Sequence, residues 1–406
     1  MQHRTRNRAA FTLLEVMIAM ALTLFVMVIL SQAFVSSLDT FSGMKGIGDM
    51  QQALRTATVL LTDDLASDHF DGKRRLSDVD AAGNQLIVTQ KPQAGFFAVK
   101  RGSAPSLVGP GYIFEGSDAS GMPSYRAVDQ MLYMTVKRKG NRQENYFTTP
   151  VSGAPNVLSA FFAPNIKMAY NVTTNPDLQL SSWTQQYNPV TNPTQGFFAS
   201  QWAEVVWYLF PTGTTEEPTI PGGSGTPTFG LYRAQFVMVP DPNIAAMELN
   251  KVNWPLPNAA PLTTSTFAGL SCVPAGGSKL TFYSPADAAL GQRMLPNFST
   301  FTAAAANPIF DPRAKAVSTL VCPNVISFHV QVMPTDQTAA AWGVPPRTFI
   351  DIPAFSPTPT YDTTQFTPAG IAAGYPQGGL KGISVTLRVW DHGTRQTRQT
   401  TVMQDL

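Results

Sequence analysis

The sequence predicts an α+β fold, in which a long N-terminal transmembrane and amphipathic α-helix packs on a large, mainly antiparallel β head. Two observations predict this fold. None of the 33 prolines precedes Pro92, so the first segment of the chain is free to form one long helix. Later segments such as Ile383–Trp390 alternate apolar and polar residues, which is typical of strands with one buried face.

The first 35 residues combine a basic leader with an apolar, membrane-length segment. Residues 1–10 contain three arginines and no acidic residue, which favours a cytoplasmic N-terminus. Glu15 lies near the start of the apolar segment, and residues 16–30 carry no charge. A carboxylate at mid-membrane depth costs about 2.5–3.5 kcal/mol, so Glu15 is a functional candidate that needs a positive partner. Cleavage between Ala10 and Phe11 would create such a positive group, the α-amino group of Phe11.

The string Ala10-Phe11-Thr12-Leu13-Leu14-Glu15 resembles the cleavage and methylation segment of type IV prepilins and type II secretion pseudopilins. The resemblance implies that prepilin peptidase cuts between Ala10 and Phe11. It also implies that Phe11 becomes N-methylated and that Glu15 takes part in subunit pairing. The family usually has glycine before the cut, and Ala10 departs from that pattern. The resemblance therefore adds the type IV pilin-like fold to the expectation.

Two other interpretations of this segment remain open. An ordinary signal peptide also has a basic region, an apolar region and a small-residue cleavage site, for which Ser31-Gln32-Ala33 is suitable. The other interpretation is a plain signal-anchor helix. Neither explains Glu15, which would lie inside the apolar region in both cases.

The helix is expected to continue beyond the membrane as an amphipathic segment over residues 36–66. Its apolar residues recur at steps of three and four, which predicts one stripe that packs on a globular head. The stripe contains Leu38, Phe41, Met44, Ile47, Met50, Leu54, Ala57, Leu61 and Leu65. Glycines at 43, 46 and 48 interrupt this region, and each costs about 1 kcal/mol relative to alanine, which predicts a bend or local melting there.

Residues 67–406 read as a periplasmic β-rich head with long loops rich in proline and glycine. The predicted strands are Leu86–Thr89, Met131–Arg138, Glu204–Phe210, Leu231–Val239, Val325–Met333 and Ile383–Trp390. The strands with Val206-Trp207-Tyr208, Leu231-Tyr232-Arg233 and Val325-Ile326-Ser327-Phe328 resemble those of PilW-type minor pilins and of type II secretion pseudopilin J. A head of about 340 residues is larger than a typical pseudopilin, which favours the PilW-type interpretation.

The two cysteines, Cys272 and Cys322, lie in the part of the chain that the helix would direct to the periplasm. In an oxidising compartment a disulfide between them is the expectation. It would close a loop of about 50 residues and stabilise the fold by roughly 4 kcal/mol. The alternative is two buried thiols.

Composition and motifs indicate no enzyme. Removal of the three leader arginines takes the formal net charge from +2 to −1, so no basic excess suggests nucleic acid. The histidines of the mature chain, His69, His329 and His392, form no metal-binding pair at helical or ribbon spacing. The G-x-S-x-G and H-E-x-x-H motifs are absent. We therefore expect no active site, no metal and no cofactor.

The resemblance implies a minor pilin that joins a tip or priming complex and promotes type IV pilus assembly. The implied partners are prepilin peptidase, other minor pilins, the major pilin, a large tip adhesin and inner-membrane lipid. The expected organisation is a leader (1–10), a transmembrane helix (11–35), its amphipathic continuation (36–66) and a periplasmic head (67–406). The protein would move from the inner membrane to the pilus tip. Pseudopilin J and an adhesive or glycan-binding head on a pilin stalk are the alternatives.

Overall fold

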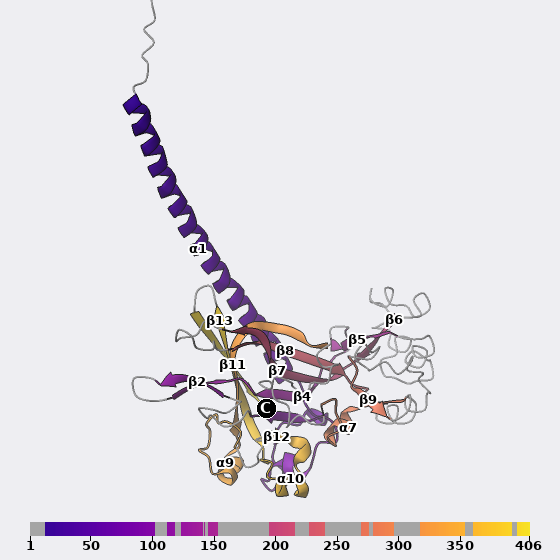
Figure 1. Ribbon diagram of the computed structural model, residues 1–406. Helices are drawn as coiled ribbons and strands as arrows, with labels where there is room; N and C mark the ends of the chain where they lie inside the picture. Colours follow the sequence, from indigo (N-terminus) through magenta and orange to yellow (C-terminus); the bar gives the residue numbers. More distant parts are fainter. Residues whose placement is uncertain are drawn as a thin grey trace, which may run out of the picture.

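A computed structural model describes residues 13–101, 112–117, 123–140, 142, 145–152, 195–215, 227–239, 269–275, 279–295, 317–353, 360–391 and 396–406. The dominant element is helix α1 (Leu13–Ala66), which has 54 residues and is about 81 Å long at 1.5 Å per residue. Figure 1 shows α1 projecting from the head as one continuous rod, with only its C-terminal part against the strands. The expected α+β fold, a long apolar helix packed on an antiparallel β head, is confirmed.

The head is built on one eight-stranded antiparallel sheet with the strand order β12-β1-β4-β7-β8-β11-β13-β14. Its strands are β1 (Phe97–Lys100), β4 (Met131–Lys137), β7 (Trp202–Thr215), β8 (Pro227–Val237), β11 (Thr319–Pro334), β12 (Thr360–Asp362), β13 (Leu380–Asp391) and β14 (Gln396–Asp405). Sequential neighbours in the chain pair as hairpins at β7–β8 and β13–β14. The edges of the sheet are therefore β12, which is short, and β14, which is long.

Smaller elements surround this sheet. Three two-stranded ladders pair β2 (Tyr112–Ser117) with β3 (Pro123–Ala127), β5 (Phe147–Ser152) with β6 (Gln195–Ser200), and β9 (Cys272–Ala275) with β10 (Lys279–Phe282). The short helices are η1 (Asp71–Lys73), α2 (Leu86–Thr89), α7 (Pro285–Ala289), α9 (Asp336–Trp342), η5 (Thr363–Gln365) and α10 (Pro368–Ala372). Ser284 begins α7 with a capping box, and Thr335 and Thr367 cap α9 and α10.

Five of the six predicted strands are confirmed, since they lie on β4, β7, β8, β11 and β13. The prediction for Leu86–Thr89 is wrong, because this segment is the helical turn α2. Its Thr89 and Gln90 N–H groups donate to the carbonyls of Gln85 and Leu86 at 3.1 and 2.9 Å. The buried Gln85 side chain donates to both Thr335 and Thr338, which anchors the segment beside α9. The apolar side chains of α2 thus pack without strand pairing in the described part of the chain.

The predicted apolar stripe of α1 packs on the sheet from Met50 onward. Met50, Leu54, Ala57, Leu61 and Leu65 are buried. The stripe residues closer to the membrane end, such as Phe41 and Met44, remain exposed. The buried part of the stripe therefore joins helix and head, while the rest of α1 is left outside the core.

Of the bend or local melting predicted at the glycines, the melting is wrong, because α1 continues through Gly43, Gly46 and Gly48 without interruption. A Cβ atom at Gly46 would lie 2.8 Å from Oδ2 of Asp391, at the end of β13. The absence of a side chain at Gly46 therefore lets the helix approach the strand end closely. This close approach is a physical reason for a glycine inside a continuous helix.

The two faces of the sheet are covered by different parts of the chain. Trp207 and Glu204 on β7 have opposite parity, so their side chains point to opposite faces. The Trp207 indole contacts α1, whereas the Glu204 carboxylate contacts Ser271 and the Met294 backbone. The helix therefore covers one face, and the segments that flank β9, β10 and α7 cover part of the other.

Candidate functional site

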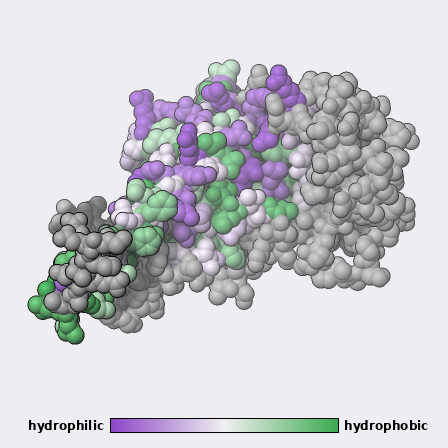
Figure 2. Space-filling view, turned by 90° about the horizontal axis from the view of Figure 1, so that it is seen from above, coloured by the Kyte–Doolittle hydropathy of each residue, from purple (hydrophilic) through white to green (hydrophobic). Residues whose placement is uncertain are grey.

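The most distinctive surface of the molecule is the part of α1 that projects from the head, residues 13–38. Every side chain from Leu13 to Leu38 is exposed, and most are apolar. Among the described residues, α1 is the one helix long and apolar enough to cross a membrane. Figure 2 shows this hydrophobic surface at the projecting end of the molecule. In water such a surface would be strongly unfavourable, so it requires lipid or other helices.

Glu15 lies in the first turn of this exposed segment. Its side chain is exposed, and it is surrounded along the helix by Leu13, Leu14 and Val16, which are exposed apolar residues. The predicted cleavage residues Ala10 and Phe11 lie outside the described residues, so the structure does not test them.

A buried ion pair fastens the other end of α1 to the head. Nε of Arg233 donates to Oδ2 of Asp64 at 2.7 Å, and a second guanidinium nitrogen donates to Oδ1 at 2.8 Å. The Trp207 indole N–H also donates to Oδ2, at 2.8 Å. Trp207 and Arg233 are cross-strand partners on β7 and β8, so one carboxylate of the helix binds two adjacent strands. The two-pronged geometry fixes the rotation of the helix as well as its position.

Sequence reasoning missed Asp64, although a signal was present. Asp64 follows Leu61 by three residues, so it lies on the apolar stripe, where an unpaired charge would be costly. The complementary cation, Arg233, lies in the Leu-Tyr-Arg segment of β8, which the sequence predicts to be a strand. A charged residue on a buried stripe and a charged residue in a strand together indicate a helix–sheet ion pair.

The opposite face of the sheet contains a second buried polar cluster. Glu204 accepts hydrogen bonds from the hydroxyl groups of Tyr133 and Ser271 and from the Met294 N–H at 3.1 Å. The Arg293 guanidinium pairs with Asp362 at 2.6 Å. Burial raises the pKa of Glu204 above its ordinary value, despite these hydrogen bonds. The five side chains of this cluster are buried, so the cluster joins β4, β7 and the covering segments. They are Tyr133, Glu204, Ser271, Arg293 and Asp362.

The predicted disulfide is wrong, because Cys272 and Cys322 are buried thiols with no disulfide between them. Cys322 lies opposite Leu231 on β8, whereas Leu270, two residues before Cys272, pairs with Val237 further along the same strand. Six residues of strand span about 20 Å. Disulfides need Cα atoms within about 7 Å, so this geometry excludes the bond. Burial also raises the pKa of the Cys322 thiol to about 12, which disfavours the reactive thiolate.

The described histidines have structural partners. His69 is buried, and its Nδ1 lies 2.8 Å from the Thr135 carbonyl. Because a carbonyl can only accept, Nδ1 carries the proton, and burial lowers the pKa of the ring. Nε2 of His329 lies 2.6 Å from the Asp351 carboxylate. Among the described residues, no group of three His, Cys, Asp or Glu side chains is arranged to hold a metal; His392 lies outside them.

Residues 5–31 match the prokaryotic N-terminal methylation motif. No curated protein and no solved structure matches the chain. The matched segment is the one that contains Ala10, Phe11 and Glu15, and it runs into the exposed half of α1.

The matched motif and the fold together define a type IV pilin-like protein, a component of a pilus or secretion system. Proteins of this class are normally structural and not enzymatic. The motif implies processing by prepilin peptidase, and the apolar helix that follows it indicates anchoring in the inner membrane before assembly.

Proposed function

We propose that this protein is a minor pilin that joins a tip or priming complex and promotes assembly of a type IV pilus. The observation that carries the proposal is the combination of an exposed apolar half-helix and a large head fastened to the other half of the same helix. The apolar half holds the subunit among other helices, and the head then occupies the end or the outside of the bundle they form.

The proposed pathway begins with cleavage between Ala10 and Phe11, which creates an ammonium group at Phe11. Glu15 of one subunit then pairs with the Phe11 ammonium of its neighbour and sets the axial position of the two helices. An ion pair in a low-dielectric setting is strong, and removal of one partner leaves the other charge at a cost of several kcal/mol. This asymmetry favours one register of the subunits over the others.

The domain organisation follows from the same proposal. Residues 1–10 are removed as the leader, residues 11–35 span the membrane, and residues 36–66 link the membrane to the head. The observed packing of α1 from Met50 to Leu65 supports the link, because these residues attach to the sheet. Residues 67–406 form the periplasmic head. Other minor pilins, the major pilin and a large tip adhesin are the proposed partners.

A type II secretion pseudopilin J is the second candidate. The N-terminal methylation motif and the helix-on-sheet plan suit this role as well. The two candidates differ in the system they serve, since a pseudopilin supports export of folded proteins and a minor pilin supports surface filaments.

A deletion strain distinguishes the two candidates. If the protein is a minor pilin, deletion lowers the number of surface filaments at least tenfold while secretion of type II substrates stays normal. The reverse result assigns pseudopilin J. Mass spectrometry of the purified protein should also show a mature chain that begins at N-methylated Phe11. A chain that begins at Phe34 would instead restore the ordinary signal peptide and contradict both candidates.

A further inference from the structure

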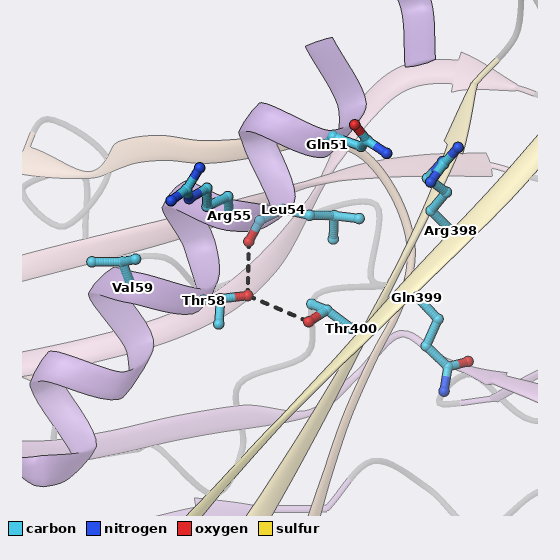
Figure 3. Close-up of a pocket in the computed structure, with 8 residues that line it drawn as sticks. All are labelled: Gln51, Leu54, Arg55, Thr58, Val59, Arg398, Gln399 and Thr400. Carbon is cyan, nitrogen blue, oxygen red and sulfur yellow. Dashed lines mark hydrogen bonds between the residues drawn. The ribbon is translucent and has the colours of Figure 1, made fainter. Parts of the chain in front are cut away.

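Helix α1 and the edge strand β14 enclose a groove of about 450 Å³ on the surface of the head. Leu54, Arg55 and Val59 line it from the helix, and Arg398, Gln399 and Thr400 line it from the strand (Figure 3). The hydroxyl groups of Thr58 and Thr400 lie 3.5 Å apart, where the helix meets the strand. The groove is thus continuous with the helix surface and with the open edge of the main sheet.

Two arginines give the groove a positive charge that the described part of the chain does not neutralise. No ion pair among the described residues includes Arg55 or Arg398. Nε of Arg398 is buried and has no hydrogen-bond partner among those residues. A buried donor without an acceptor is costly, and a carboxylate is the acceptor that best fits a guanidinium. The groove therefore favours an acidic ligand.

The strand beside the groove lacks the features that protect sheet edges. β14 pairs with β13 over ten residues with no register shift. It contains no proline, and residues 399–404 carry no charge. Natural sheets protect their edges with short strands, bulges, prolines or lysines. The opposite edge follows that rule, because β12 has three residues. A long, regular edge strand with an uncharged middle is suited to pairing with another strand.

The hydrogen-bonding groups that point away from β13 can be assigned from the ladder. The Leu406 N–H donates to the Lys381 carbonyl at 3.0 Å. Residues of an antiparallel edge strand alternate between inward and outward backbone groups. The N–H groups of Gln399, Thr401 and Met403 therefore point outward. Figure 3 shows Thr400 facing the helix, so the side chains with inward backbone groups line the helix side of the strand.

We propose that an extended segment of a neighbouring pilin-like subunit adds to the outer edge of β14 and places a carboxylate in the groove that Arg55 and Arg398 line. The backbone of that segment would bind the outward groups of β14, and its acidic side chain would complete the charge of the groove. The proposal rests on the proposed assembly function, because assembly brings a second subunit alongside α1. It adds a contact on the head that is separate from the pairing of Glu15 in the membrane.

The test is photo-crosslinking in the native strain with the full-length protein. A photoreactive residue at Gln399 should form an adduct with another chain that carries an N-terminal methylation motif, and the crosslinked peptide should contain Asp or Glu. Arg55→Glu combined with Arg398→Glu should lower the adduct yield at least tenfold, because like charges then meet in the groove. Arg347→Glu makes a single charge reversal of the same kind at an exposed site away from the groove, and should leave the yield unchanged.

A second pair of variants tests how much the backbone of β14 contributes to binding of the segment. Thr401→Pro removes an outward N–H without removing a bond to β13, and should lower the adduct yield at least tenfold. Thr401→Val keeps the N–H and the branched shape, and should keep the yield. Unchanged protease resistance of each variant shows that the head is folded. Arg398→Gln replaces the double variant if charge reversal prevents folding, and it should lower the yield at least threefold.

The outcomes separate this inference from the proposed function. If the groove variants keep the full adduct yield while Glu15→Ala abolishes filaments, the groove inference is wrong and the proposed function stands. If neither set of variants changes filament number, the proposed function is wrong as well. Adducts to lipid, to nucleic acid or to a protein without the methylation motif would overturn the groove inference.

Discussion

The Asp64 carboxylate joins helix α1 to the head. A single carboxylate binds Arg233 twice and Trp207 once, and all three groups are largely shielded from water. A buried ion pair adds little compared with an apolar pair of the same shape, but removal of one partner leaves a buried charge. The value of Asp64 is therefore specificity of the helix position, and its loss is expected to be severe.

Asp64→Asn should lower the free energy of unfolding by about 3–5 kcal/mol, because Arg233 would keep its charge without a counter-charge. Urea unfolding of the full-length protein in detergent, followed by tryptophan fluorescence, measures this change. Asp63→Asn is the matched control, since the Asp63 side chain is 62% exposed and pairs with Arg138 at 3.5 Å. It should cost less than about 1 kcal/mol. Equal unfolding midpoints for the two variants would contradict the role assigned to Asp64.

Glu204 makes the stability of the head depend on pH. Burial raises the pKa of Glu204 in the folded state above the ordinary carboxyl value of about 4.3. The folded state therefore holds the proton more tightly than the unfolded state. Its stabilisation is complete below the unfolded pKa and is lost as pH rises through the folded pKa.

Glu204→Gln removes this titration. Its carbonyl oxygen can still accept from the Met294 N–H, and its NH2 group can donate to the Ser271 hydroxyl. The difference in unfolding free energy between parent and variant should fall as pH rises from about 4 toward neutrality. Unfolding midpoints measured at a series of pH values check this directly. A difference that is constant with pH, or one that grows with pH, would show that Glu204 does not titrate as expected.

At the scale of elements, α1 shows how one helix serves two environments. Its exposed half needs residues with high helix propensity and apolar side chains. Its packed half needs side chains that fit against the head. Gly46 and Gly48 differ in their surroundings. A Cβ atom at Gly46 would crowd Asp391, whereas one at Gly48 would meet no atom within 4 Å.

Gly48→Ala should therefore stabilise the protein by about 1 kcal/mol through helix propensity alone. Gly46→Ala should gain less, because the new methyl group displaces the Asp391 side chain. Thermal unfolding of both variants in the same detergent compares them. A larger gain for Gly46→Ala than for Gly48→Ala would mean that the close approach of helix and strand does not constrain position 46.

Much of this element pattern could be predicted from the sequence, and the exceptions have physical causes. The periodic stripe identified the packed residues of α1 from Met50 onward, and alternation identified β4, β7, β8, β11 and β13. Alternation could not identify β14, because an edge strand has little apolar surface to bury. Leu86–Thr89 failed because four β-branched or apolar residues are too few to choose between a strand and a helical turn.

The candidate site was predictable to a different degree. The segment that matches the methylation motif contains Glu15 and the proposed cleavage residues Ala10 and Phe11. These predictions need only local sequence, and they stay predictions. The pairing of Asp64 with Arg233 joins residues 169 positions apart, and only the fold shows which cation the carboxylate meets. The disulfide prediction failed for the same reason. Neither the expected compartment nor the even number of cysteines indicates how far apart the fold places Cys272 and Cys322.

At the scale of the whole molecule, the protein combines an apolar helical arm with a β head that packs on the other half of the same helix. The head is held to α1 by the stripe that ends at Leu65 and by the Asp64 ion pair. Movement of the helix out of the membrane therefore carries the head with it. An arm and a head fixed in this way are suited to placing a large domain at a defined point of a helical bundle.

The proposed pairing of Glu15 with the Phe11 ammonium of a neighbour is tested most directly by Glu15→Ala in a strain that carries only the variant. Membrane insertion and leader cleavage should stay normal, because removal of a carboxylate from an apolar helix makes insertion easier. Recovery of partner pilins by pulldown and the number of surface filaments should fall at least tenfold, since the neighbour's ammonium would lie in lipid without its counter-charge. Glu15→Gln should behave like Glu15→Ala. Normal partner recovery and normal filament numbers in Glu15→Ala would contradict the pairing.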